Sequence, residues 1–163
     1  MKRLISLMLL TLFFLFSCAH VVSKEWREKA DTEINTQQLF KSPADYKGKI
    51  VIIGGVIIKS TNTKEGTYIE VVQMPLDSTG KPEKRDVSYG RFLILYEGYL
   101  DTAIYSRGRE VTVAGEVIGE KTRPLGEIQY SYLLVKSKEL YLFEEMRYKS
   151  LPVWFGIDVW RRM

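Results

Sequence analysis

The residue with the most definite chemistry is Cys18, the single cysteine of the chain. It directly follows Ser17, a small residue of the kind that a signal peptidase needs before its cleavage point. The basic pair 2–3 and the apolar run 4–16 come before both. This order is typical of a bacterial lipoprotein signal, in which the thiol receives a diacylglycerol and becomes the first residue of the mature chain. We therefore predict that residues 1–17 are a signal peptide and that Cys18 is lipidated.

Two alternatives for the apolar run 4–16 are a membrane-spanning anchor and an ordinary secretory signal with an incidental cysteine. A spanning helix needs about 20 apolar residues, whereas this run has thirteen, and charged residues follow from Lys24 onward. The ordinary signal is disfavoured because the only cysteine occupies the one position that lipidation uses. Phe16 is bulkier than the residue usual at its position, and we expect slower cleavage for that reason.

Lipidation also predicts where the protein resides. A triacylated cysteine buries on the order of 40 methylenes at about 0.8 kcal/mol each, so dissociation from a bilayer would be negligible. The residue after the cysteine is Ala19, whereas an aspartate there commonly retains lipoproteins of enteric bacteria in the inner membrane. We therefore expect an outer-membrane location with the protein facing the periplasm, and a membrane partner held through the N-terminal lipid.

Few side chains are suited to catalysis or to metal binding. His20 is the only histidine, so the chain cannot supply a His-based triad or a multi-histidine metal site. The pair Gly54-Gly55 lies in a strand-like run and precedes no helix, which disfavours a phosphate-binding loop. We expect no enzyme, no metal and no cofactor. Carboxylate catalysis stays formally open, because a fold could bring together Glu70, Asp77, Asp86, Asp101 and Glu116.

The charge balance argues against a nucleic-acid partner. The chain has 24 Lys and Arg residues against 20 Asp and Glu, and loss of Lys2 and Arg3 with the signal leaves 22 against 20. Basic residues also alternate with acidic ones, as in the run 81–86, instead of gathering in a stripe. With no second cysteine, the domain must be held together by its core and not by an internal disulfide.

The elements that would position these residues are mostly strands. The polar stretch 18–42 is predicted to be a tether, helical in part, with a short helix capped by Thr36 that ends near Ser42 because Pro43 disfavours helical geometry before it. Two glycines, Gly54 and Gly55, predict a bulge or bend. Runs of β-branched or alternating apolar residues predict strands over 50–58, 67–74, 91–96, 110–117 and 126–137, with 139–143 as an extension or a separate strand.

The connections complete the predicted domain. We expect a turn over 60–66, a long polar loop over 76–90, and a connector over 97–108 with a short helix around 100–105. A bent first strand and a connector between the third and fourth strands are typical of an OB-fold. The fold class is therefore mainly β, a small five- to six-stranded OB-like Greek-key barrel over 43–145, with a short N-terminal helix and a lipid-tethered N-terminus.

Aromatic residues are the candidates for binding. Tyr68, Tyr96, Tyr130 and Tyr132 fall in predicted strands, where they would either stack on a glycan or fill core and rim positions, as tyrosine commonly does. The apolar aromatic tail 146–163 contains two tryptophans followed by two arginines. It is expected either to lie at the membrane interface or to pack on the barrel.

Several segments together resemble one known family. They are GGVI at 54–57, TYIEVVQMPLD at 67–77, SYGRF at 88–92, GYLD at 98–101 and GREVTVAG at 108–115. In order and spacing they are similar to the Slp family of outer-membrane lipoproteins, from about Pro43 to Val135. Thr102 departs from an expected proline, and Phe143 from a frequent tryptophan. The resemblance implies an outer-membrane lipoprotein, induced in some bacteria by starvation or in stationary phase, with no established catalytic activity.

Two functions remain open on these grounds. The first is a non-catalytic lipoprotein with a structural or envelope-stress role, whose barrel contacts other envelope proteins or the membrane. The alternative is a periplasmic binding module for a glycan or small molecule, displayed from the membrane. Only the second predicts a concave pocket with convergent polar groups.

Overall fold

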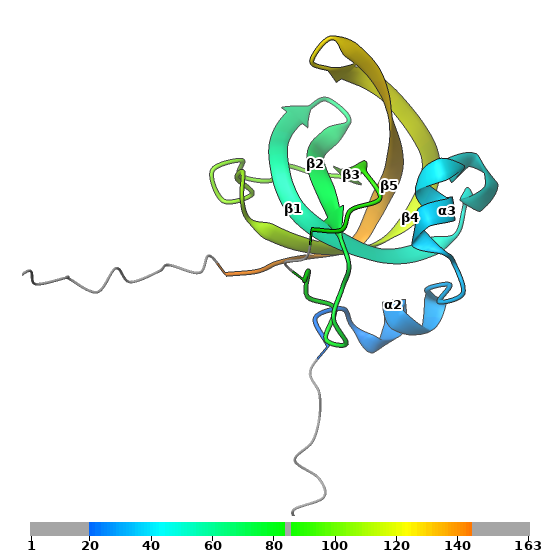
Figure 1. The fold of residues 1–163 in the computed structure, drawn as a ribbon. Helices are drawn as coiled ribbons and strands as arrows, with labels where there is room; N and C mark the ends of the chain where they lie inside the picture. Colours follow the sequence, from blue (N-terminus) through cyan, green and yellow to red (C-terminus); the bar gives the residue numbers. More distant parts are fainter. Residues whose placement is uncertain (1–19, 84–85, 145–163) are drawn as a thin grey trace, which may run out of the picture.

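Five strands form a closed barrel in the order β1-β2-β3-β5-β4, in which β4 pairs back with β1 (Figure 1). The structure, a computed structural model, describes residues 20–83 and 86–144. Neighbouring strands are antiparallel except β3 and β5, which are parallel. The predicted mainly-β, OB-like barrel is confirmed. The strands are β1 Ile50–Thr63, β2 Gly66–Met74, β3 Arg91–Tyr96, β4 Glu110–Leu125 and β5 Ile128–Leu142.

Among the described residues, three short helical elements precede the barrel: α2 Lys24–Lys29, α3 Thr36–Lys41 and the 3-10 helix η2 Pro43–Tyr46. No described helix has the length and apolar character needed to cross a membrane. The predicted signal 1–17, the lipidation site Cys18 and the tail 146–163 lie outside the described residues.

The barrel interior is filled by alternate residues of each strand, as the period of two in a strand requires. Ile57, Ile69, Phe92, Val111 and Leu133 are each at most 1% exposed and belong to one cluster. The in-phase valines predicted for β4 include Val111, Val113 and Val117, all fully buried. This cluster is the main core.

The two glycines of β1 lie where this strand is paired on both sides. β1 pairs with β4 over 50–56 and with β2 from Gly54 onward, so Gly54 and Gly55 have close neighbours on both edges. A Cβ on Gly55 would lie 1.8 Å from the carbonyl oxygen of Val72. The register shift between β1 and β2 comes later, between Ile57 and Lys59. Of the two predicted alternatives, a bulge or a bend, a bulge at the glycines is therefore wrong, and the glycines permit close approach of the neighbouring strands.

Both hairpins extend beyond the barrel core, and the predicted strand ends were too short. β1 continues to Thr63 and its loop is only residues 64–65, not 60–66. β4 continues to Leu125, and β5 starts only at Ile128 and includes most of the predicted extension 139–143. The hairpin arms are rich in polar and exposed residues. Hydrophobic alternation therefore does not reveal them, although backbone pairing does.

The connector between β3 and β4 contains no helix around 100–105, so that prediction was wrong. The backbone N–H groups of Ile104 and Tyr105 donate to the carbonyl oxygen of Asp101 at 3.1 and 2.9 Å, which makes one turn. The Asp101 carboxylate accepts the N–H of Ala103 at 2.8 Å. A side chain that bonds its own backbone in this way favours a turn over a continued helix.

The part of the 18–42 segment that the structure describes is packed on the barrel, unlike the free tether that we expected. Leu39 of α3 is 1% exposed and belongs to the main core. Helix α3 ends at Lys41 with Ser42 as its C-cap, in agreement with the predicted end near Ser42, but its N-cap is Asn35 and not Thr36. The Asn35 side chain accepts the N–H of Gln38 at 3.2 Å, which satisfies a free donor of the first turn.

Candidate functional site: a cleft between two hairpins

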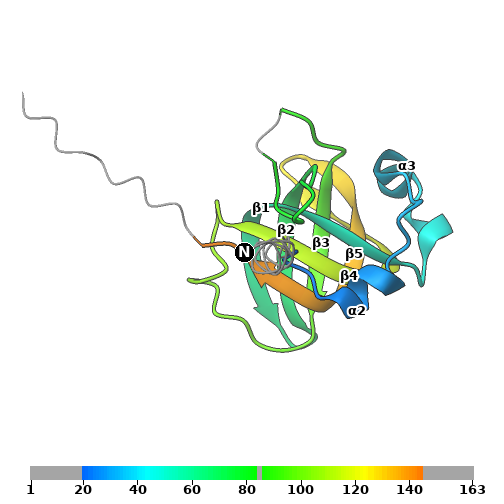
Figure 2. The same ribbon diagram turned by 90° about the horizontal axis from the view of Figure 1, so that it is seen from below.

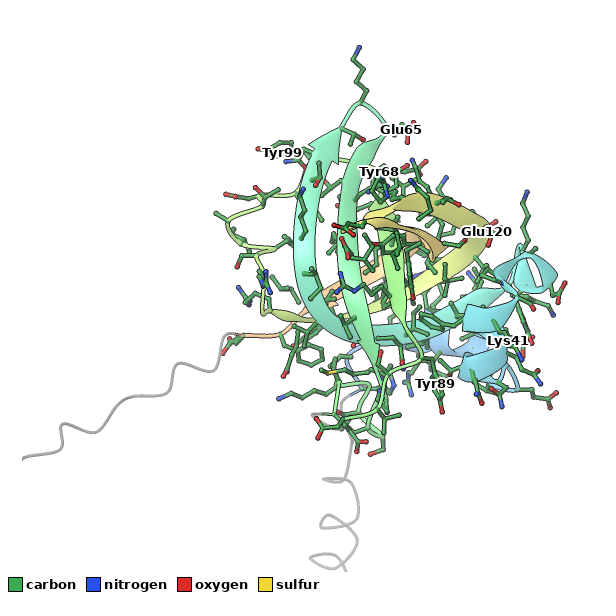
Figure 3. The ribbon with its side chains drawn as sticks, turned by 45° about the horizontal axis from the view of Figure 1, so that its top comes forward. Lys41, Glu65, Tyr68, Tyr89, Tyr99 and Glu120 are labelled. Carbon is green, nitrogen blue, oxygen red and sulfur yellow. The ribbon has the colours of Figure 1, made fainter. Side chains whose placement is uncertain are left out.

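The outer part of the β4–β5 hairpin lies over the outward side of β2 and β3. From this hairpin, the Lys121 ammonium donates to the hydroxyl of Tyr68 on β2 at 2.9 Å. The Tyr132 hydroxyl donates to Glu70, also on β2, at 3.2 Å. Figure 3 shows Tyr68 between the β2 ribbon and the β4–β5 hairpin, with Glu65 at the neighbouring hairpin tip. The two hairpins thus enclose a cleft on the side of the barrel where OB-folds bind ligands.

The floor of the cleft is a second apolar cluster, distinct from the main core. Tyr68, Leu93 and Tyr132 are 4%, 1% and 2% exposed, and Tyr130 packs against them. The rings of Tyr130 and Tyr132 meet edge to face, with centroids 4.8 Å apart. Three of the four tyrosines that the sequence singled out are therefore gathered here. Tyr96 lies apart, half-buried on β3.

The open part of the cleft has a volume of about 200 Å³. Pockets for drug-sized ligands span roughly 300–1,000 Å³, so this one suits a single small group. Its walls combine two cations, two tyrosines, one carboxylate, one hydroxyl and a proline. They are Lys59, Thr61, Tyr68, Glu70, Arg123, Pro124 and Tyr132.

The carboxylate in the cleft is already neutralised. Arg91 donates to Glu70 at 2.7 Å, and the Tyr132 hydroxyl donates to the same carboxylate oxygen. The hydrogen bond with Glu70 raises the pKa of Arg91. Burial, reinforced by the negative charge of Glu70, raises the pKa of Tyr132. Glu70 is therefore the shared acceptor of Arg91 and Tyr132 within this network.

A second network lies at the rim. Tyr68 donates to Glu65, and Lys121 lies 3.6 Å from the same carboxylate. The hydrogen bond from Tyr68, followed by the charge of Lys121, lowers the pKa of Glu65. Lys121 and the Arg123 guanidinium both lie against the Tyr68 ring, at 4.3 and 4.4 Å from its centroid. Such contacts hold cations over an aromatic face.

Two cations of the cleft have no carboxylate within ion-pair distance in the part of the chain that the structure describes. They are Lys59 on β1 and Arg123 on β4. Both line the same pocket as Tyr68 and Tyr132. The arrangement offers positive charge beside aromatic rings, which suits a small anionic group on a ring-shaped ligand.

The candidate carboxylates lie on separate elements with partners of their own. Asp77 accepts hydrogen bonds from Thr79 and Lys81 within its own loop. Glu116 pairs with Lys138 at 3.0 Å. Asp86 lies exposed in the loop before β3 and Asp101 in the β3–β4 connector. Across residues 20–83 and 86–144, no group of three or more His, Cys, Asp and Glu side chains is placed to hold a metal ion.

The cationic residues of the cleft were not predicted from the sequence. Lys59 and Arg123 lie in hairpin arms that were predicted as loop or left outside the strands. A long polar arm has no hydrophobic pattern, so its residues are placed only by the strand pairing that the fold shows. The tyrosines, in contrast, were found because they lie in apolar strands.

The fold and the polar cleft place the protein in the class of small OB-like barrel domains. Comparison with known proteins identifies the family. The family model for the outer membrane lipoprotein Slp family matches residues 15–161, and the chain belongs to this family. The resemblance found in the sequence is thereby confirmed.

Curated relatives agree with the family. The chain is 29% identical to the outer membrane protein Slp of Escherichia coli over 124 residues, which are 76% of this chain and 65% of the relative. It is 27% identical to the uncharacterized lipoprotein YeaY of the same organism over 123 residues, 72% and 63% of the two chains. An uncharacterized protein of Haemophilus influenzae is 29% identical over 135 residues, 78% and 73%. The match spans just under two thirds of the two Escherichia coli relatives.

Proposed function

We propose that this member of the Slp family is anchored in the outer membrane by lipid on Cys18, faces the periplasm, and has a non-catalytic structural or envelope-stress role in starvation or stationary phase. The observation that carries the proposal is the pair Ser17–Cys18 after the apolar run 4–16, in a chain of an outer-membrane lipoprotein family. A lipid anchor on Cys18 accounts both for the residue order at 4–18 and for membership of an outer-membrane lipoprotein family.

The contacts of the acidic residues support a non-catalytic role. A general acid or base needs a pKa near the working pH and access to a substrate. Glu70 is instead paired with Arg91, and Glu116 with Lys138. Asp77 shapes its own loop, and the hydrogen bond from Thr79 is the main cause that lowers its pKa. These carboxylates serve the structure.

Replacing Cys18 by serine is expected to abolish membrane attachment. In a Gram-negative host, the native chain should yield an intact mass of residues 18–163 plus lipid, in the outer-membrane fraction. The Cys18→Ser chain should carry no lipid and leave that fraction, because the thiol that accepts the diacylglycerol is missing. Ser17→Ala is the matched control, since alanine keeps a small residue before the cleavage point. A native product that is soluble and without lipid would contradict the anchor.

A second candidate function is favoured by the cleft: binding of an anionic glycan or small molecule. In the described part of the chain, Lys59 and Arg123 have no carboxylate within ion-pair distance, although the charge of Arg123 acts on Glu65, and both line the same pocket as Tyr68 and Tyr132. Cation and ring would recognise an acidic group on a sugar, through a charge-assisted hydrogen bond and stacking. The pocket lies between the two hairpins, on the face of the barrel where OB-folds bind oligosaccharides.

Charge reversal in the cleft tests this second function. In detergent-solubilised full-length protein, Lys59→Glu with Arg123→Glu is expected to weaken retention on peptidoglycan or lipopolysaccharide fragments at least about tenfold, since one charged hydrogen bond contributes about 1.5–3 kcal/mol. Lys41→Glu with Lys47→Glu, both exposed and outside the cleft, is the matched control, because it changes the net charge by the same four units. Lack of retention of the native protein on every glycan, or equal loss in the control, would count against the cleft as a site.

A further inference from the structure

The first described residues are fixed to one end of the barrel. Val22 is 1% exposed. The N–H of Val21 donates to the carbonyl oxygen of Thr79 at 2.9 Å. Ser23 donates to the carboxylate of Glu139 on β5 through both its backbone N–H, at 3.0 Å, and its hydroxyl, at 2.7 Å. Residues 21–23 are therefore bound to the barrel and do not form a loose tether.

The loop that receives this segment is itself well fixed. The Asp77 carboxylate accepts the N–H groups of Thr79 and Lys81 at 2.8 and 3.0 Å. The hydroxyl of Thr112, a fully buried residue of β4, donates to the carbonyl oxygen of Gly80 at 2.7 Å. Gly80 lies against the His20 ring so closely that a Cβ would be 2.7 Å from it. The contact between residues 20–23 and the barrel thus rests on backbone that cannot shift freely.

The length of chain before this contact is short. Only two peptide units separate Cys18 from His20, and each spans 3.8 Å between Cα atoms, so the two Cα atoms are at most about 7.6 Å apart. A lipid on Cys18 places that residue at the headgroups of the bilayer. A flexible linker of about 20 residues would reach roughly 25 Å. The link between Cys18 and His20 is much shorter than such a linker.

We propose that the barrel is seated directly on the lipid leaflet in one orientation, with the end formed by α2 and the loop 76–83 against the headgroups. The proposal rests on the lipidation of Cys18 proposed above. Seen from below, α2 lies beside the point where the described chain begins (Figure 2). On α2, Lys24 and Arg27 are exposed and Lys29 lies 4.5 Å from the ring of the half-buried Trp26. Tryptophan and basic residues are enriched at the headgroup level of membranes.

The same orientation turns the cleft away from the membrane. Lys81, in the seated loop, lies 3.9 Å from Glu110 at the start of β4. From there β4 runs through 16 residues to Leu125 beside the cleft, a contour of about 50 Å at roughly 3.3 Å per residue before curvature shortens it. In Figure 1, α2 and the β4–β5 hairpin lie at opposite ends of the molecule. The tips of both hairpins would therefore point away from the membrane, where they are accessible to other molecules.

Fluorescence quenching by lipid tests the seating. In the anchored protein Cys18 is acylated, so a cysteine introduced at Lys24, Lys81, Lys64 or Ile128 is the only free thiol for a dye. The lipidated variants are placed in vesicles of phosphatidylethanolamine and phosphatidylglycerol that contain a lipid with a nitroxide headgroup. We expect loss of fluorescence at positions 24 and 81 and none at the hairpin tips, 64 and 128. Equal quenching at all four positions, or none, in vesicle-bound protein would overturn the seating.

Two further variants separate the fixed contact from the short link. An insertion of about ten glycine and serine residues after Ala19, which reaches roughly 17 Å, should reduce quenching at position 81 to the level at the hairpin tips while flotation with vesicles continues. The same insertion in the loop 126–127 should leave quenching at position 81 unchanged. Val22→Asp should release the segment and give the same loss as the first insertion. A native chain without lipid by intact mass would overturn the proposed function and the seating with it. Flotation with uniform quenching would overturn the seating alone.

Discussion

Gly55→Ala is expected to lower the free energy of unfolding by at least about 3 kcal/mol, at the upper end of what overpacking costs. The added Cβ would lie 1.8 Å from the carbonyl oxygen of Val72 and 3.0 Å from a methyl of Val71. The carbonyl cannot retreat without breaking the β1–β2 ladder, in which Val56 pairs with Val72. Because a domain of this size has only about 5–15 kcal/mol of stability, this single methyl group would remove roughly a fifth to three fifths of it.

Urea denaturation of the full chain, followed by circular dichroism, measures this loss. Gly48→Ala is the control, because Gly48 has φ 84° but nothing within 4 Å of its Cβ position. Its cost should be only the left-handed backbone, about 1–2 kcal/mol. If the two substitutions cost the same, close approach of the strands is not what the glycine provides.

The sequence was informative wherever burial imposes a pattern. β3 was predicted over the observed 91–96, and β2 within one residue, because their apolar residues face the core. The hairpin arms of β1 and β4 were missed because their side chains are mostly polar and are exposed or only half-buried. There the strand is held by backbone pairing, which leaves no trace in composition. Since the cleft is built from these arms, its cations could not be located from the sequence.

The N-terminal segment shows a second reason for a wrong prediction. Its composition is that of a tether, since most of its side chains are charged or polar. Two apolar residues, Val22 and Leu39, are nevertheless buried. Backbone bonds from Val21 to Thr79 and from Asp31 to Ile50 add to this packing. Backbone hydrogen bonds are independent of residue type, so a segment can be docked by them while its sequence still resembles a linker.

The packing of the N-terminal segment on the barrel determines which way the cleft faces in the proposed seating. A barrel on a long tether would sample many orientations, and any part of its surface could meet a partner. In the proposed seating, residues 21–23 hold the end near α2 against the leaflet, and the cleft faces away from the membrane. A charge-reversed cleft should then alter contacts with glycans or envelope proteins and leave membrane attachment unchanged. Loss of Cys18 should do the reverse.

Phe92→Ala is the second substitution from which we expect a large effect, about 3–5 kcal/mol of unfolding free energy. Phe92 is fully buried in the main core. Its ring meets that of Phe40 edge to face, with centroids 6.1 Å apart and planes at 89°. Truncation therefore leaves a cavity inside the barrel and also removes one of the contacts that hold α3 against it, beside that of Leu39. The loss should exceed the transfer free energy of the ring alone, because β3 is paired on both sides and cannot collapse into the space.

Two measurements separate the cost of the cavity from the cost of the lost contact with α3. Thermal unfolding gives the total loss, and Ile128→Ala at the exposed hairpin tip should stay within about 0.5 kcal/mol of the native chain. Hydrogen exchange reports α3 separately, through the Leu39 amide that donates to the Asn35 carbonyl at 3.0 Å. Phe40→Ala should raise exchange at this amide as Phe92→Ala does, with a smaller loss of global stability because Phe40 is only half-buried. Unchanged exchange in both variants would mean that α3 is held by Leu39 and not by the aromatic pair.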